Sequence, residues 1–186
     1  MNSVQRWLKT GLLSLVVLGA NQHPAMGSDK FLPVTTSSLS PCSAPEYHQF
    51  DFWIGDWDVL DKAGDTLGTS HVESALGGCV LCETWHGIAG GEGQSFTSWN
   101  PGLHRWEQYW VDGQGVPIFF TGRIEDQELH LRADSATRGG TPLQRRVTLS
   151  KSPNGRLRQL SETSWDAGRT WTTEYDFYYV KRGAPR

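Results

Sequence analysis

The chain is poor in the residues that build metal, redox and nucleic-acid sites. It contains three cysteines and six histidines among 186 residues, and no two histidines have the two-residue spacing that places both rings on one face of a strand. Its formal net charge is −3, and its basic residues form no clustered stripe. We therefore expect no metal ion, no haem or other cofactor, and no nucleic-acid partner.

Long apolar runs are also missing, apart from one near the N-terminus. Residues 12–18 form an apolar core that is too short to span a bilayer, and Arg6 and Lys9 precede it. Residues 25–27 (Ala-Met-Gly) then provide a small-x-small cleavage site. This order of features is typical of a secretory signal peptide.

The sequence divides into three parts on this basis. We interpret residues 1–27 as the signal peptide and residues 28–46, which are rich in Ser, Thr and Pro, as an extended, mobile lead segment. Residues 47–182 are long enough for a single domain with its own core. We expect the mature protein to be secreted or periplasmic, with no stable membrane anchor after cleavage.

Helical periodicity is absent from this domain, because no long window carries an apolar helical stripe. Short alternating runs recur instead, separated by turn residues such as Asn-Pro-Gly at 100–102. Because an open sheet of this size would expose two edges, we expect an all-β domain, a mostly antiparallel up-and-down β-barrel of about ten strands. A two-sheet sandwich is the alternative. The expected strands are residues 57–62, 66–74, 80–88, 93–100, 104–112, 116–124, 127–135, 142–150, 156–164 and 171–181.

Aromatic side chains are expected to close one end of this barrel. Residues 50–59 (FDFWIGDWDV) place an aromatic cluster, with a short helical turn, before a Gly-x-Trp step. Gly55 allows the backbone to bend or approach closely, and the ring of Trp57 can cover the barrel floor. We expect Trp53, Trp57 and Trp171 to fill this end.

Strand alternation indicates which side chains point inward. Trp106, Gln108, Trp110 and Asp112 share one face of their strand, which we expect to be inside because it buries two tryptophan rings. Gln108 then lies between two buried rings and needs a hydrogen-bond partner.

Two further strands show the same alternation. Glu83 shares a face with Leu81 and Trp85, so we expect its carboxylate inside the barrel. The last strand is expected to present one aromatic face, formed by Trp171, Thr173, Tyr175, Phe177 and Tyr179, with Thr172, Glu174 and Asp176 on the other.

Aromatic rings with a few polar groups are typical of a ligand pocket. The same composition fills a small packed barrel, so a small or absent pocket is the alternative. The candidate ligand-binding residues are Glu83, Trp85, Trp99, Trp106, Gln108, Trp110, Asp112, Arg123 and Arg158.

The inward carboxylates of Glu83 and Asp112 permit two interpretations. A buried carboxylate has a raised pKa unless it is paired, so Glu83 can act as a base near neutral pH. Alternatively, it accepts hydrogen bonds from Arg158, Arg123 or Gln108 and holds strands together, and we favour this structural interpretation.

The cysteines predict one disulfide bond in an oxidising compartment. Cys79 and Cys82 lie where a turn enters a strand, and no helix follows that would make them a redox pair. We expect a Cys42–Cys79 disulfide, with Cys82 as a small buried hydrophobic residue.

Residues 164–171 (SWDAGRTW) match the Asp-box pattern of sialidase propellers. A chain of this length cannot hold such a propeller, and the motif occurs once. We interpret it as a structural hairpin in which Asp166 accepts backbone N–H groups, Gly168 takes an unusual φ and Trp171 packs beneath.

Four segments resemble a family of small exported bacterial proteins without an established function: 48–59 (HQFDFWIGDWDV), 77–85 (GGCVLCETW), 106–112 (WEQYWVD) and 164–168 (SWDAG). The Gly-x-Trp opening is also similar to the lipocalin and wider calycin signature. The resemblance implies a calycin-like barrel and brings no catalytic residue. It also implies that Arg182 could stack on Trp57 as a lipocalin-type arginine.

Three classes of function fit these features. We favour a carrier or scavenger of a small, partly apolar ligand. An isomerase- or dehydratase-type enzyme that uses Glu83 or Asp112 as its base is the alternative, and a structural or interaction module with a filled barrel is the third. We assign no catalytic residue, and a Gly-x-Ser-x-Gly nucleophile elbow is absent.

Overall fold

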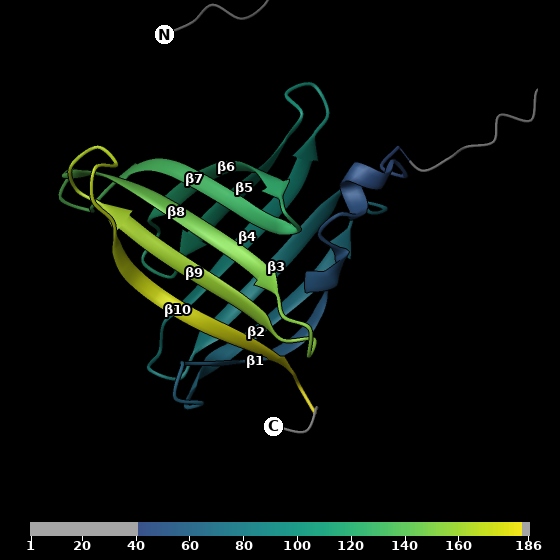
Figure 1. The fold of residues 1–186 in the computed structure, drawn as a ribbon, viewed down its shortest axis with the longest axis horizontal. Coiled ribbons are helices and arrows are strands. Elements are labelled where there is room, and N and C mark those ends of the chain that lie inside the picture. Colours follow the sequence, from purple (N-terminus) through teal and green to yellow (C-terminus); the bar gives the residue numbers. More distant parts are fainter. Residues whose placement is uncertain (1–40, 184–186) are drawn as a thin grey trace, which may run out of the picture. The chain divides into compact units, whose positions relative to one another are not determined.

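The computed structural model describes residues 41–183, which form a closed β-barrel (Figure 1). The expected signal peptide and most of the expected lead segment lie outside the described residues. The last part of that lead segment is described, and it contains a disulfide-bonded cysteine and the start of a 3₁₀ helix.

Ten antiparallel strands make the barrel, and each one pairs with its neighbours in the chain. Strand β1 closes the barrel by pairing with β10, and Trp57 lies opposite Lys181 in that pair. The fold class and the strand positions predicted from the sequence are therefore confirmed. The strands are β1 (Gly55–Leu60), β2 (Thr66–Ala75), β3 (Val80–Gly87), β4 (Glu92–Asn100), β5 (Arg105–Asp112), β6 (Pro117–Glu125), β7 (Glu128–Ala136), β8 (Pro142–Lys151), β9 (Leu157–Ser164) and β10 (Thr172–Lys181).

Two short 3₁₀ helices, η1 (Pro45–His48) and η2 (Asp51–Trp53), precede β1 and close one end of the barrel. Phe50, Trp53, Trp57 and Trp106 are each only 1% exposed, and they belong to one core cluster. The Trp57 Nε1–H donates to the Trp53 carbonyl at 2.8 Å, which satisfies the polar atom of this buried ring. We call this side of the molecule the closed end.

A cation does cover Trp57, but it is Lys181 rather than Arg182. The Lys181 Nζ lies 4.1 Å from the centre of the Trp57 ring and donates to the Ile54 carbonyl. The strand register decides this, because Lys181 is directly opposite Trp57 whereas Arg182 points toward Asp58. Gly55, at φ 136°, leaves room for the lysine, since a Cβ there would collide with its Nζ.

An irregularity in β10 changes the expected face of its first residues. The pairing with β9 shifts register between Thr173 and Tyr175, so Glu174 is an extra residue in the ladder. Because each added residue reverses the alternation, Trp171 and Thr173 do not share a face with Tyr175. Trp171 stacks under the guanidinium of Arg146, 4.3 Å from its ring centre. The prediction that Trp171 fills the closed end is therefore wrong.

The hairpin between β9 and β10 has the expected Asp-box construction. The backbone N–H of Thr170 donates to Asp166 at 2.9 Å, and the Thr170 hydroxyl donates at 2.7 Å. Gly168 takes φ 82°, and the Trp171 Nε1–H donates to its carbonyl. The bonds from Thr170 and Ser164 lower the pKa of Asp166 to about 2.

Cys42 and Cys79 form the expected disulfide bond, which joins the segment before η1 to the turn between β2 and β3. Cys82 is a free thiol in β3, and it is half-buried rather than fully buried as predicted. Its partner in β4 is Phe96, which is 54% exposed, so this row of side chains lies on the outer wall. Burial and the nearby Glu73 raise the pKa of the Cys82 thiol. Within residues 41–183, no helix has the length and apolar character needed to cross a membrane.

We expect loss of the disulfide to destabilise the barrel without changing its strands. The bond closes a segment with a sequence separation of 37, which corresponds to about 4 kcal/mol in the loop-entropy model. Urea unfolding of Cys42→Ser/Cys79→Ser should show this loss, whereas Cys82→Ser should unfold close to wild type. Equal midpoints for the double variant and Cys82→Ser would contradict it.

Candidate functional site

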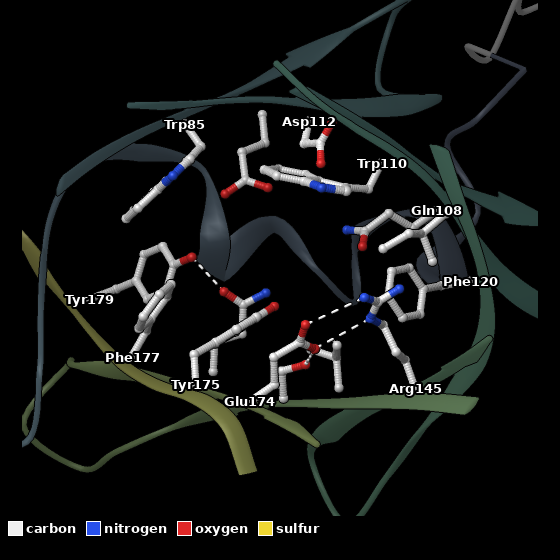
Figure 2. Close-up of a pocket in the computed structure, with 15 residues that line it drawn as sticks. Trp85, Gln108, Trp110, Asp112, Phe120, Arg145, Glu174, Tyr175, Phe177 and Tyr179 are labelled. Atoms are coloured by element: carbon white, nitrogen blue, oxygen red, sulfur yellow. Dashed lines mark hydrogen bonds and ion pairs between the residues drawn. The ribbon is translucent and has the colours of Figure 1, made fainter. Parts of the chain in front are cut away.

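A cavity of about 300 Å³ lies inside the barrel, toward the end opposite η1 and η2 (Figure 2). Its walls come from β9, the C-terminal parts of β3 and β5, and the N-terminal parts of β6, β8 and β10. These ends of the strands meet at the same end of an antiparallel barrel. The cavity opens at this end, where Glu174 keeps 36% of its side chain exposed. The lining residues are Glu83, Trp85, Gln108, Trp110, Asp112, Ile118, Phe120, Arg145, Val147, Gln159, Ser161, Glu174, Tyr175, Phe177 and Tyr179.

Aromatic rings form one side of this cavity. Trp85 stacks on Phe177 with ring centres 5.5 Å apart, and Phe177 stacks on Tyr175 at 4.4 Å (Figure 2). Two glycines make room for the tryptophans, because a Cβ on Gly68 would collide with Trp85 and a Cβ on Gly93 would collide with Trp110. This side of the cavity is therefore a surface of stacked aromatic rings.

Glu83 is the most deeply buried carboxylic acid of the cavity, because the residue is only 5% exposed to solvent. Its Oε1 accepts the Ser70 hydroxyl at 2.9 Å and its Oε2 accepts the Ser95 hydroxyl at 3.1 Å. These partners lie on β2 and β4, the two neighbours of β3. Burial raises the pKa of Glu83 from 4.5 to about 7, although both hydrogen bonds act in the opposite direction.

None of the expected partners of Glu83 bonds to it: Arg123 is exposed, and the other two make different contacts. Arg158 forms a bidentate ion pair with Asp176, at 2.7 and 2.9 Å. The Gln108 amide donates to the Thr97 hydroxyl at 2.9 Å. Among the described residues, no lysine or arginine forms an ion pair with Glu83.

Two tyrosines face the same interior. The Tyr179 hydroxyl donates to the Gln159 side-chain oxygen (Figure 2). Burial raises the pKa of both Tyr175 and Tyr179, and the negative charge of Glu83 adds to each increase. Both hydroxyls are therefore neutral hydrogen-bonding groups at physiological pH.

The rim of the cavity carries three charged side chains. Arg145 and Glu174 form an ion pair at 3.3 Å, and Figure 2 shows both reaching toward the interior. Glu174 also accepts the hydroxyls of Ser161 and Thr163. Asp112 accepts the backbone N–H groups of the following turn through its Oδ1.

Five of the nine candidate ligand-binding residues line the cavity: Glu83, Trp85, Gln108, Trp110 and Asp112.

The other four do not line it. Trp106 belongs to the closed end, where it contacts Phe50 and Trp99. Arg123 is exposed, and Arg158 points to the outer face of its strand, where Asp176 holds it. Alternation places Arg158 outside, because its neighbour Gln159 and also Ser161 line the cavity from the same strand.

Three polar side chains that line the cavity were not predicted from the sequence: Arg145, Gln159 and Glu174. Arg145 shares one face of β8 with the buried Leu143, Val147 and Leu149. This spacing of two residues would have placed Arg145 inside the barrel. No comparable signal exists for Glu174, because the β10 irregularity that turns it inward does not follow from alternation.

Within the described part of the chain, no group of three or more His, Cys, Asp or Glu side chains could hold a metal ion. The cavity itself presents hydroxyls, amides, carboxyl groups, one guanidinium and aromatic rings.

We expect Glu83→Gln to remove a pH-dependent part of the stability. The folded-state pKa of about 7 lies above the unfolded value of 4.5, so the stabilisation by neutral Glu83 is complete below pH 4.5 and is lost as the pH rises through 7. The glutamine mimics the neutral acid. The variant should therefore match wild type near pH 4.5 and be more stable at pH 8 by about 3 kcal/mol.

Urea unfolding at several pH values measures this difference. Glu73→Gln is the matched control, because Glu73 is an exposed carboxylate on β2, the strand next to β3. Unfolding curves of Glu83→Gln that stay parallel to wild type across this pH range would refute the assignment.

No protein-family model matches the chain, and no curated protein matches it either. The family resemblance seen in the sequence stays a prediction.

Proposed function

We propose that this protein binds and carries a small, partly apolar molecule outside the cytoplasm. The supporting observation is the cavity of about 300 Å³ at the open end of the barrel. Apolar and aromatic walls with a few convergent polar groups are the usual composition of a small-molecule site. Its volume is at the low end of the range for such sites, which favours a small ligand.

The arrangement of the interior favours this function over that of a filled structural module. Large aromatic rings fill the closed end, where Trp53 and Trp57 are 1% exposed. The same barrel leaves its other end hollow, with Gly68 and Gly93 holding two tryptophans against the wall. A purely structural core would gain stability by filling that space.

The disulfide supports a location outside the cytoplasm. Such bonds persist in secreted and periplasmic proteins and are rare where thiols are kept reduced. The Cys42–Cys79 bond and the expected signal peptide are consistent with each other.

We expect Ile118→Trp to abolish ligand binding, because Ile118 lines the cavity and a larger ring there occupies its volume. Phe119→Trp is the matched control, since the neighbouring residue points outward and is 49% exposed. Native mass spectrometry of protein purified from its own host should show a bound small molecule in wild type and Phe119→Trp. Occupancy should fall at least about tenfold in Ile118→Trp.

Circular dichroism of both variants establishes that each keeps its strands. A bound mass that persists in Ile118→Trp would contradict the proposed site. A wild-type protein that is empty, and that no member of a metabolite library stabilises in thermal melts, would contradict the proposed function.

One observation favours a second candidate, an enzyme that transfers protons. Glu83 has a pKa of about 7 and lines a cavity, which are the properties of a general base near neutral pH. Such an enzyme should exchange a C–H hydrogen of the co-purified molecule for deuterium in D₂O, and Glu83→Gln should stop the exchange. Binding without exchange would leave the carrier as the function.

A further inference from the structure

The balance of charge inside the cavity is negative. Three carboxyl groups line it, those of Glu83, Asp112 and Glu174, against one guanidinium, that of Arg145. The pair between Arg145 and Glu174 cancels one charge of each sign. Glu83 and Asp112 remain without a cation from the described residues that line the cavity.

The carboxylate oxygens of Glu83 can accept further hydrogen bonds. Each carboxylate oxygen accepts a single serine hydroxyl, and each oxygen has a further lone pair. The apolar wall of Trp85, Phe177 and Tyr175 lies in the same cavity. Aromatic faces attract cations, and this attraction grows when water is excluded.

We propose that the cavity takes a small organic cation, a protonated amine on an apolar, aromatic-sized body, whose N–H groups donate to Glu83. This inference rests on the proposed function and specifies its ligand class. Pairing with an N–H favours an amine over a quaternary ammonium ion, which has no proton to donate. A ligand carboxylate would meet the surplus negative charge and be repelled.

The inference fixes the direction in which affinity changes with pH. The side chains beside Glu83 on β2 and β4 are the uncharged Ser70 and Ser95, and those on β10 are Tyr175 and Tyr179, which stay neutral. The other titratable side chains that line the cavity are Asp112, Arg145 and Glu174, which lie at its rim. The pKa of Glu83 is raised to about 7, and a cation binds the ionised form of this group.

This behaviour separates a cation from a neutral ligand. Raising the pH from 6 to 8 converts Glu83 from mostly neutral to mostly ionised, so affinity for an amine should rise about tenfold. A neutral ligand that accepts a hydrogen bond from the neutral acid should show the opposite trend.

Isothermal titration calorimetry with three probes of similar shape tests the inference. The probes are 2-phenylethylamine, 2-phenylethanol and 3-phenylpropionate, each titrated at pH 6 and pH 8. At pH 8 we expect the amine to bind at least about tenfold more tightly than the alcohol or the carboxylate. In Glu83→Gln, the preference for the amine and its pH dependence should both disappear, whereas Glu73→Gln should behave as wild type.

The outcomes distinguish this inference from the proposed function. If the alcohol or the carboxylate binds as tightly as the amine, the cavity is a binding site and the cation assignment is wrong. Affinity for the amine that falls between pH 6 and pH 8 would also overturn it. If none of the probes binds, the amine assignment is refuted, while the host-purified protein tests the binding function separately.

Discussion

The closure of ten strands into one barrel determines how the interior of this protein is used. Barrel diameter grows with strand number, and a barrel of about eight strands is just filled by its own side chains. Ten strands enclose more space than eight. This extra interior volume is either filled by elements other than the strands or remains hollow. Here η1, η2 and their aromatic cluster occupy one end, and the other end contains the cavity.

Glu83 shows what such a hollow interior permits. An isolated carboxylate in a packed core would lose its hydration, at a cost of several kcal/mol. At this site two serine hydroxyls replace part of that hydration, and the open cavity leaves the remaining lone pairs accessible. The pKa of Glu83 remains raised because the hydrogen bonds from the two serines offset only part of the lost hydration energy. The raised pKa and the proposed contact with a ligand therefore have the same structural origin, a carboxyl group that is buried yet borders the cavity.

Most of the barrel follows from local patterns that the sequence carries openly. Alternation and turn residues locate the strands, and the inward face of β5 follows because Trp106 and Trp110 share it. The Cys42–Cys79 disulfide is present as predicted, although the sequence favoured this pairing without fixing it.

The errors arose where the outcome depends on pairing between distant strands. The partners of Glu83 are Ser70 and Ser95, which the register of β2 and β4 places beside it. Arg158 was a candidate partner of Glu83 whose facing the sequence did not fix, and the structure pairs it with Asp176 of β10 instead. Glu174 depends on an inserted residue in β10, whose position no periodicity reveals.

The closed end also has a consequence for how a ligand of the proposed kind would exchange with solvent. The disulfide ties the segment before η1 to the turn between β2 and β3, and Lys181 anchors the last strand to Ile54 across the same floor. Under the proposed function, a molecule in the cavity would enter and leave at the open end, past Asp112 and the Arg145–Glu174 pair. The rim charges would then act on its residence time, whereas the deeper groups around Glu83 would act on which molecule binds. Substitutions at the rim and near Glu83 would therefore change retention and selection separately.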